Sequence, residues 1–355
     1  MRRGTAWTVF WITSLIFGVC FLWPLLQVLK GGVWIEGRFN FSYLRGVFQN
    51  PIYAEGLFNS FRLAIGTTTL ASLIGIPLAW LSNRFDFPLK KAFGALVLVP
   101  MILPPFVGAI GFQMILGQYG ALNTLLHLGP VDWLGGGRYW GVILLQSLSL
   151  YPIIYLNTAA ALANIDHAMD EAAENLGCSG FRKFRRITLP LIAPGLFAGG
   201  TIVFIWSFTE LGTPMMLNYT KCAPVQIYDG LKEIGSNPFP YALVIVLLTF
   251  SLGLYALSKR LFGGKAYAMQ SKAATTFATI PVRGIKGLLV MLPFLVVVGF
   301  ALLPHAGVIL NSLAVPGSWY QSVLPQDFTL GNFDEALGHR DGDRGHPQPS
   351  SARSP

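Results

Sequence analysis

Long apolar runs constrain the fold of this chain more than any other feature of its sequence. A run of about 20 apolar residues can cross a hydrocarbon layer roughly 30 Å thick. Seven such runs occur, at residues 7–29, 60–81, 93–116, 140–163, 191–211, 241–257 and 287–310. Only 12% of the residues are charged, whereas an ordinary soluble domain carries about a quarter. The sequence therefore predicts an all-α polytopic membrane protein.

The basic residues indicate how these runs are oriented. Lys and Arg beside membrane spans are retained on the cytoplasmic side. If Arg2 and Arg3 are cytoplasmic, the inner segments also hold Arg84, Lys90, Lys91, Arg182, Lys183, Arg185, Arg186, Lys259, Arg260, Lys265, Lys272, Arg283 and Lys286. The outer segments hold fewer basic residues: Lys30, Arg38, Arg45, Arg62, Arg138, Lys221 and Lys232. We therefore interpret the net charge of +9 as a sign of orientation. It predicts a multi-pass protein of the cell inner (plasma) membrane, surrounded by lipid, with a cytoplasmic N-terminus and no nucleic-acid partner.

The N-terminal run has two readings. Arg2 and Arg3 before an apolar segment also fit a secretory signal, but the run is long and lacks a small-x-small cleavage site, so we expect an uncleaved first span. Cys20, Cys178 and Cys222 show no pairing pattern or metal-ligand spacing, and the histidines are scattered. We expect no metal site and no cofactor.

The most specific motif lies in a charged loop, residues 164–190, between the fourth and fifth runs. It contains Asp170-Glu171-Ala172-Ala173-Glu174-Asn175-Leu176-Gly177 and, after a basic run, Ile187-Thr188-Leu189-Pro190. Acids early in one short helix and bases after a turn suit the helix dipoles. Gly177 can adopt the positive φ that ends a helix, and Pro190 is tolerated in a first helical turn. We expect a two-helix elbow on the cytoplasmic membrane surface.

This pattern resembles the cytoplasmic loop of binding-protein-dependent ABC importer permeases. The matching positions are Glu171, Ala172, Ala173, Gly177, Ile187, Leu189 and Pro190. Cys178 is a mild departure, because a small residue such as Ala is expected there. The resemblance implies a type I importer permease fold, an elbow held by a separate ATP-binding ABC subunit, and a periplasmic or extracellular substrate-binding protein. The alternative is a generic amphipathic helix that bases anchor at the membrane.

No catalytic motif accompanies the elbow. Gly264-Lys265 lacks the earlier glycine and the following Ser or Thr of a phosphate-binding loop. The sequence also contains no nucleophile elbow and no H-E-x-x-H helix. We therefore expect a non-catalytic subunit without catalytic residues, in which a partner chain hydrolyses ATP.

Three features inside the spans are candidates for the transport pathway or its packing. Glu210 lies at the outer end of the fifth run, where a carboxylate marks either a pathway or gate or a cap on the following loop. Pro104 and Pro105 in the third run should break or kink a helix, which membranes tolerate where protein or a cavity satisfies the freed carbonyls. Gly195 and Gly199, spaced G-x-x-x-G, are typical of close helix packing.

The order of features suggests an incomplete internal duplication. Residues 1–262 form a six-span unit, 263–286 a basic cytoplasmic linker, and 287–337 one further span with an outer segment. The first and last spans each contain a proline and lead to similar outer stretches, Asn40-Phe41-Ser42-Tyr43-Leu44 and Asp327-Phe328-Thr329-Leu330-Gly331-Asn332-Phe333. Residues 338–355 are charged and rich in Pro and Ser, so we expect disorder there. We expect that the reading frame was lost near Gly338 or that the gene is truncated there.

These features resemble the permease class that serves ferric iron, in which two six-span copies are often fused. The resemblance implies an importer permease for ferric iron that needs a second permease half, supplied by self-association or by a separate chain. An importer of the same type for 2-aminoethylphosphonate, polyamine, sulfate or molybdate remains an alternative, because the elbow motif indicates coupling to an ATPase and does not identify the substrate. An ion-coupled secondary transporter or channel is the alternative of another class.

Overall fold

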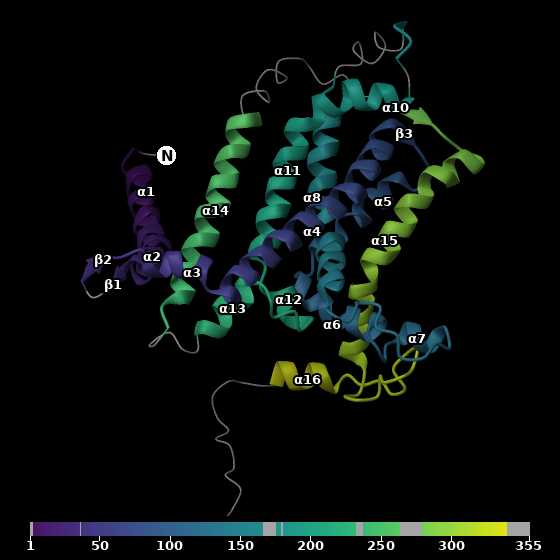
Figure 1. The fold of residues 1–355 in the computed structure, drawn as a ribbon. Helices are drawn as coiled ribbons and strands as arrows, with labels where there is room; N and C mark the ends of the chain where they lie inside the picture. The colour runs from purple at the N-terminus through teal and green to yellow at the C-terminus, as the bar shows by residue number, and fades with distance from the viewer. Residues whose placement is uncertain are drawn as a thin grey trace, which may run out of the picture.

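The computed structural model describes residues 3–35, 37–165, 175–178, 180–231, 237–262 and 279–338 (Figure 1). Six helices in these ranges are long and apolar enough to cross a membrane: Trp7–Val33, Pro51–Arg84, Tyr139–Ala163, Gly180–Thr209, Phe239–Leu261 and Gly284–Leu313. A seventh candidate is the bent pair Lys90–Met101 and Pro105–Leu125. All the predicted apolar runs are thus found in helical segments, and the all-α membrane fold is confirmed.

The elements follow one another in a simple order. The first half contains α1 (Arg3–Phe17), the π-helical η1 (Gly18–Leu22), α2 (Trp23–Val33), α3 (Ser42–Gln49), α4 (Pro51–Arg84), α5 (Lys90–Leu96), the 3₁₀ turn η2 (Val99–Met101), α6 (Pro105–Leu116), α7 (Ala121–Leu125) and α8 (Tyr139–Ala163). The second half contains α10 (Gly180–Lys183), the π-helical η3 (Phe184–Thr188), α11 (Leu189–Thr209), α12 (Gly212–Met216), α13 (Ala223–Gly230), α14 (Phe239–Phe262), α15 (Gly284–Leu313) and α16 (Gly331–Gly338).

Four two-residue strands join segments that are otherwise helical. β1 (Trp34–Ile35) pairs antiparallel with β2 (Arg38–Phe39), and β3 (Phe85–Asp86) pairs parallel with β4 (Ile280–Pro281). An ion pair of 3.2 Å between Arg283 Nη2 and Asp86 Oδ2 lies beside the second sheet. These contacts tie the start of the last span to the end of α4.

Helix α8 is the centre of the bundle. In its apolar window, 72% of the residues are buried, more than in any other span of the described chain. It packs between α4 and α11, and side chains such as Tyr151 and Ile154 are fully enclosed. Figure 1 shows α1 and α2 at one edge of the bundle and α15 at the opposite edge. None of the residues in the window of the first span is buried within the chain.

The third predicted span is broken. Its two helical parts meet at 99°, so the break or kink that Pro104 and Pro105 predict within residues 93–116 is confirmed. Pro104 precedes α6 with extended backbone, φ −55° and ψ 137°, and Pro105 is its first residue. A proline removes an amide donor and disfavours the α conformation of the residue before it. The pair therefore ends one helix and starts another.

The ends of the first and last spans that lie away from the elbow, here called the outer ends, repeat the same strand-like pairing (Figure 1). Trp34, just after α2, pairs antiparallel with Phe39, and Ala314, just after α15, pairs antiparallel with Phe328. A short helix then follows in both places: α3 in the first case and α16 in the second.

The hydrogen bonds after these pairings also match. The amides of Asn40 and Thr329 donate to the carbonyl of the last residue of the preceding span, at 2.9 Å and 2.8 Å. The side-chain oxygens of the same two residues accept from the amide two positions further on, at 2.8 Å and 2.9 Å. The outer connections are therefore alike in structure although their lengths differ.

Candidate functional site

The predicted elbow is partly described by the structure. Glu171, Ala172 and Ala173 lie outside the described residues, as do the neighbouring acids Asp166, Asp170 and Glu174. The described part consists of residues 175–178 and the helical segment that starts at Gly180. The basic residues and the Ile-x-Leu-Pro motif can therefore be placed, whereas the acidic start cannot.

Gly177 has the backbone conformation expected for the turn. Its φ is +73°, in the left-handed region that favours glycine, and a Cβ built there would meet no atom within 4 Å. A substitution would therefore meet backbone strain without a steric clash. Leu176 beside it is 86% exposed.

The fifth span begins earlier than expected. Pro190 lies in the first turn of α11, as expected, but the span itself starts at Gly180, because α10, η3 and α11 form one apolar segment from Gly180 to Thr209. Ile187 lies in the π-helical η3, a type of irregularity that is frequent at functional sites. Leu189 packs against the core cluster around α8, while Pro190 is exposed in the first turn of α11. The Ile-x-Leu-Pro motif thus anchors the elbow on the bundle.

Most of the basic side chains of the elbow face outward. Arg182, Arg185 and Arg186 are exposed, whereas Lys183 is buried. Phe181 is 75% exposed and its ring lies against that of Phe184, with centroids 6.5 Å apart. The elbow therefore presents basic and apolar groups together, which suits contact with another protein.

Gly195 and Gly199 lie where α11 meets α8. A Cβ on Gly195 would come within 2.7 Å of the Cβ of Ala161, and one on Gly199 within 3.1 Å of the Cβ of Asn157. Such close approach requires small residues, so the prediction of a helix-packing role is confirmed.

Glu210 ends α11 on the outer side. Its Oε1 accepts hydrogen bonds from the amide of Thr213 at 3.3 Å and from the hydroxyl of the same residue at 3.4 Å. The carboxylate thus caps α12, one of the two roles considered for it. A role for Glu210 in a pathway or gate stays a prediction.

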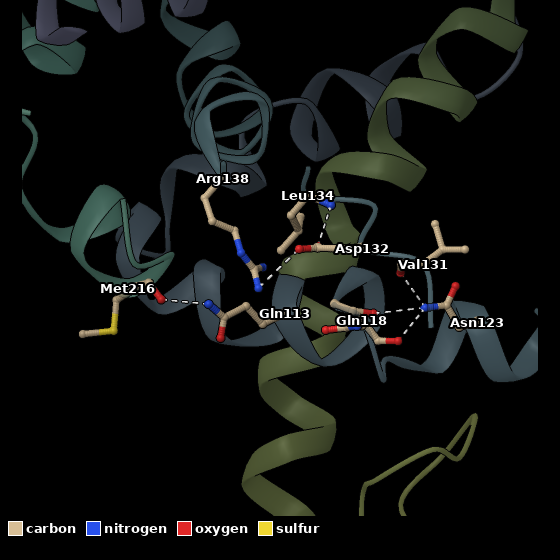
Figure 2. Close-up of polar contacts among 9 residues, drawn as sticks. Gln113, Gln118, Asn123, Val131, Asp132, Leu134, Arg138 and Met216 are labelled. Carbon is tan, nitrogen blue, oxygen red and sulfur yellow. Dashed lines mark hydrogen bonds and ion pairs between the residues drawn. The ribbon is translucent and has the colours of Figure 1, made fainter. Parts of the chain in front are cut away.

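The structure brings the helix that starts at Pro104 and Pro105 next to the helix that Glu210 caps. A Cβ on Gly212 of α12 would come within 2.6 Å of the Cβ of Phe106. Gln113 Nε2 of α6 donates to the carbonyl of Met216 at 2.8 Å (Figure 2). The two candidate pathway elements therefore form one contact on the outer side, although they are far apart in sequence.

A polar cap covers the outer end of α6. Asn123 Nδ2 donates to the carbonyls of Gln118 and Val131, at 2.9 Å and 2.7 Å (Figure 2). Trp133 Nε1 donates to Asn123 Oδ1 at 2.7 Å. Because Asn123 is buried, these bonds satisfy the loop carbonyls in place of water. The cap fixes the loop that leads to α8.

The sequence analysis missed a buried polar cluster in the middle of the bundle. Gln146 Oε1 on α8 accepts from Thr67 Oγ1 of α4 at 3.1 Å and from Ser207 Oγ of α11 at 2.6 Å. Ser147 Oγ donates to the Thr67 carbonyl at 3.2 Å. Among the described residues, Gln146 Nε2 is buried without a partner. A glutamine inside an otherwise apolar run was the available signal, because such side chains join helices in membranes.

Comparison with known proteins identifies relatives over most of the chain. The family described as "Binding-protein-dependent transport system inner membrane component" matches residues 68–262. A protein of Haloferax volcanii named as a molybdenum ABC transporter permease is 31% identical over 237 residues, covering 66% of this chain and 84% of the relative. A protein of Salmonella typhimurium named as a 2-aminoethylphosphonate transport system permease is 28% identical over 257 residues, covering 68% and 87%.

A solved structure shares the fold. The crystal structure of a bacterial ABC transporter involved in the import of the acidic polysaccharide alginate aligns with a TM-score of 0.56 at 18% identity. The alignment covers 73% of this chain and 96% of that one. At this identity the likeness concerns the arrangement of helices.

Proposed function

Because this chain belongs to the inner-membrane components of binding-protein-dependent transport systems, the ABC importer permeases, we propose that it forms one half of an oxyanion pathway driven by a separate ATPase. The best support for the coupling is the described end of the elbow, where the left-handed turn at Gly177 precedes a segment that Leu189 anchors in the core. A periplasmic or extracellular binding protein would deliver the substrate to the outer loops.

The proposed cargo differs from the ferric iron that the sequence suggested. The relatives described above are named for molybdenum and 2-aminoethylphosphonate, and another, from Prototheca wickerhamii, is named as a sulfate transport permease. Their names agree with the alternatives of molybdate, aminophosphonate and sulfate, and none of these three is named for iron. We therefore favour a small oxyanion with a tetrahedral centre.

A second permease half is needed to enclose a pathway, and α15 indicates how it would join. The outer connection after α15 repeats the one after α2, and α15 lies across α6 on one edge of the bundle. If α15 is the first span of a second unit, that span contacts α6 of this unit. By symmetry, the first span of this unit should contact the helix of the second unit that corresponds to α6. The unburied window of the first span supports this exchange, because its apolar face lacks a partner within the described chain.

Uptake into proteoliposomes tests the proposal. The full chain would be reconstituted with its second half, an ATPase subunit and a binding protein, and radioactive molybdate or sulfate uptake would be measured with and without internal ATP. Uptake should require ATP and survive collapse of ion gradients. Uptake that persists without ATP while a gradient is present would instead support a secondary transporter.

A further inference from the structure

A charged cavity lies at the outer end of the bundle and has no role in the proposals above. Its volume is about 490 Å³, and its lining includes Glu55, Arg62, Arg138, Tyr139, Tyr219 and Lys221. These residues come from α4, from the start of α8 and from the loop between α12 and α13. Segments separated by more than a hundred residues are thus brought together around one polar space.

Two of the three cations in the lining are paired. Lys221 Nζ lies 3.5 Å from Glu55 Oε1, and Arg138 Nη2 lies 3.4 Å from Asp132 Oδ2 (Figure 2). No ion pair joins Arg62 to a carboxylate within the ranges that the structure describes. Its guanidinium carbon instead lies 5.5 Å from the ring centre of Phe58 and 5.8 Å from that of Tyr139. Arg62 is therefore the charge that this part of the chain leaves uncompensated.

Arg138 is held in an unusual position at the edge of the cavity. Its φ is +58°, in the left-handed region that is unfavourable for a residue other than glycine. It follows three consecutive glycines, any of which would adopt this conformation more easily. Among the described residues, Arg138 Nη1 is buried without a hydrogen-bond partner. The strained position thus leaves a cationic donor unused beside the cavity.

Two further features favour an anion. Tyr139 is the first residue of the 25-residue helix α8, so the positive end of the helix dipole lies at the lining. Burial raises the pKa of Tyr219 to about 12, and the nearby Cys222 adds to the shift. The Tyr219 phenol is neutral at physiological pH, as it would be without this shift, and can donate a hydrogen bond to an anion.

We propose that this cavity is an oxyanion site in which Arg62 and Arg138 bind the charged oxygens at the outer entrance of the permease. The ligand class is a phosphate-like or molybdate-like oxyanion, either a free solute or the phosphate of a lipid headgroup. The role of the site in substrate entry rests on the proposed function. Binding of an oxyanion at the site does not depend on that function.

Binding to the purified full chain tests the site independently of transport. The chain would be prepared in the phosphorus-free detergent dodecyl maltoside, and molybdate, sulfate and phosphate would each be titrated by calorimetry. Arg62→Gln should weaken binding by about tenfold or more, the size of a lost charge-assisted hydrogen bond. Arg45→Gln is the matched control, because Arg45 is an exposed arginine of α3 outside the lining. It should leave binding within about twofold.

A second variant covers the case in which Arg62→Gln does not fold. Asn59 also lines the cavity, one helical turn before Arg62, and its Nδ2 donates to the carbonyl of Lys221 at 2.9 Å. Asn59→Asp should weaken oxyanion binding at least as strongly, because it places a carboxylate beside the guanidinium. The melting temperature of each variant would be measured to confirm folding.

Phosphorus analysis of the same preparations distinguishes a free oxyanion from the phosphate of a lipid headgroup. Phospholipid retained by the wild type and lost in Arg62→Gln, with no binding of added oxyanions, would assign the site to a headgroup. Unchanged oxyanion binding in both folded variants, or neither bound solute nor retained phospholipid in the wild type, would overturn the site. Binding without ATP-driven uptake would contradict the proposed function and leave the site standing.

Discussion

Gly111 of α6 and Gly307 of α15 lie backbone against backbone where these two helices cross. A Cβ on Gly307 would come within 2.6 Å of the Cα of Gly111, and one on Gly111 within 2.6 Å of the amide nitrogen of Val308. Backbone atoms cannot move aside as a flexible side chain can, so both positions require glycine. The last span is thus fitted to the broken third span.

Gly307→Val should separate these helices. We expect a loss of about 1–3 kcal/mol in the free energy of unfolding, the usual cost of overpacking a tight contact. Unfolding by SDS in mixed micelles, followed by circular dichroism, would measure it. Gly299→Val in the same helix is the control, because a Cβ there meets no atom within 4 Å. Equal destabilisation by both variants would contradict the tight crossing.

Gly177→Val should impair coupling through backbone strain. The left-handed φ of +73° costs a side-chain-bearing residue about 1–2 kcal/mol, and Asn, which tolerates this conformation, should have a smaller effect. ATPase stimulation and oxyanion uptake by the reconstituted complex should both fall, while the amount of permease in the membrane stays unchanged. Gly94→Val is the control, since a Cβ on Gly94 also meets open space. Full activity of Gly177→Val would count against a coupling role.

Variants of Glu210 can distinguish a role in capping α12 from a role in a pathway or gate. Gln keeps the oxygen that accepts from Thr213, so Glu210→Gln should retain uptake and stability. Ala removes the acceptor and should cost about 0.5–2 kcal/mol of stability. Uptake assays and thermal unfolding of both variants would decide. Loss of uptake in a stable Glu210→Gln protein would show that the charge itself is needed, as expected for a pathway residue.

Gln146→Leu should weaken the contact between α4, α8 and α11. It leaves the hydroxyls of Thr67 and Ser207 without their acceptor, and side-chain hydrogen bonds in membranes contribute about 0.6 kcal/mol on average and up to about 1.7. We expect a loss of roughly that size in the free energy of unfolding. Gln49→Leu is the control, because Gln49 is exposed. A Gln146→Leu protein as stable as the wild type would show that the cluster contributes little.

Cysteine labelling should report the orientation of the elbow. Cys178 is partly exposed next to Gly177, whereas Cys222 is buried and burial raises the pKa of its thiol to about 12. A thiol reacts as the thiolate, so Cys222 should remain unlabelled between pH 7 and about 9. A membrane-impermeant maleimide should label Cys178 in inside-out vesicles only.

A Cys178→Ser protein provides the background for this measurement, since Cys20 lies in the first span. Labelling of Cys178 in right-side-out vesicles would place the elbow outside the cell and remove it as a contact for an ATPase.

The sequence predicted the membrane class and the helical spans with little error. These features are local, because a run of apolar residues or a fixed motif reports burial in lipid and turn chemistry without reference to distant residues. The substrate was harder to predict from the sequence. The elbow motif does not identify the substrate, and the proposal of an oxyanion in place of ferric iron is drawn from the names of relatives.

Contacts between distant segments were decided by the tertiary structure alone. Pro104 and Pro105 predict a break in the third span, yet its angle of 99° depends on how α6 packs against α12 and α15. The cavity around Arg62 is built from three segments far apart in the chain, and no local pattern in the sequence indicates that these segments meet. Local sequence determines what each segment prefers, and packing between segments determines which side chains meet.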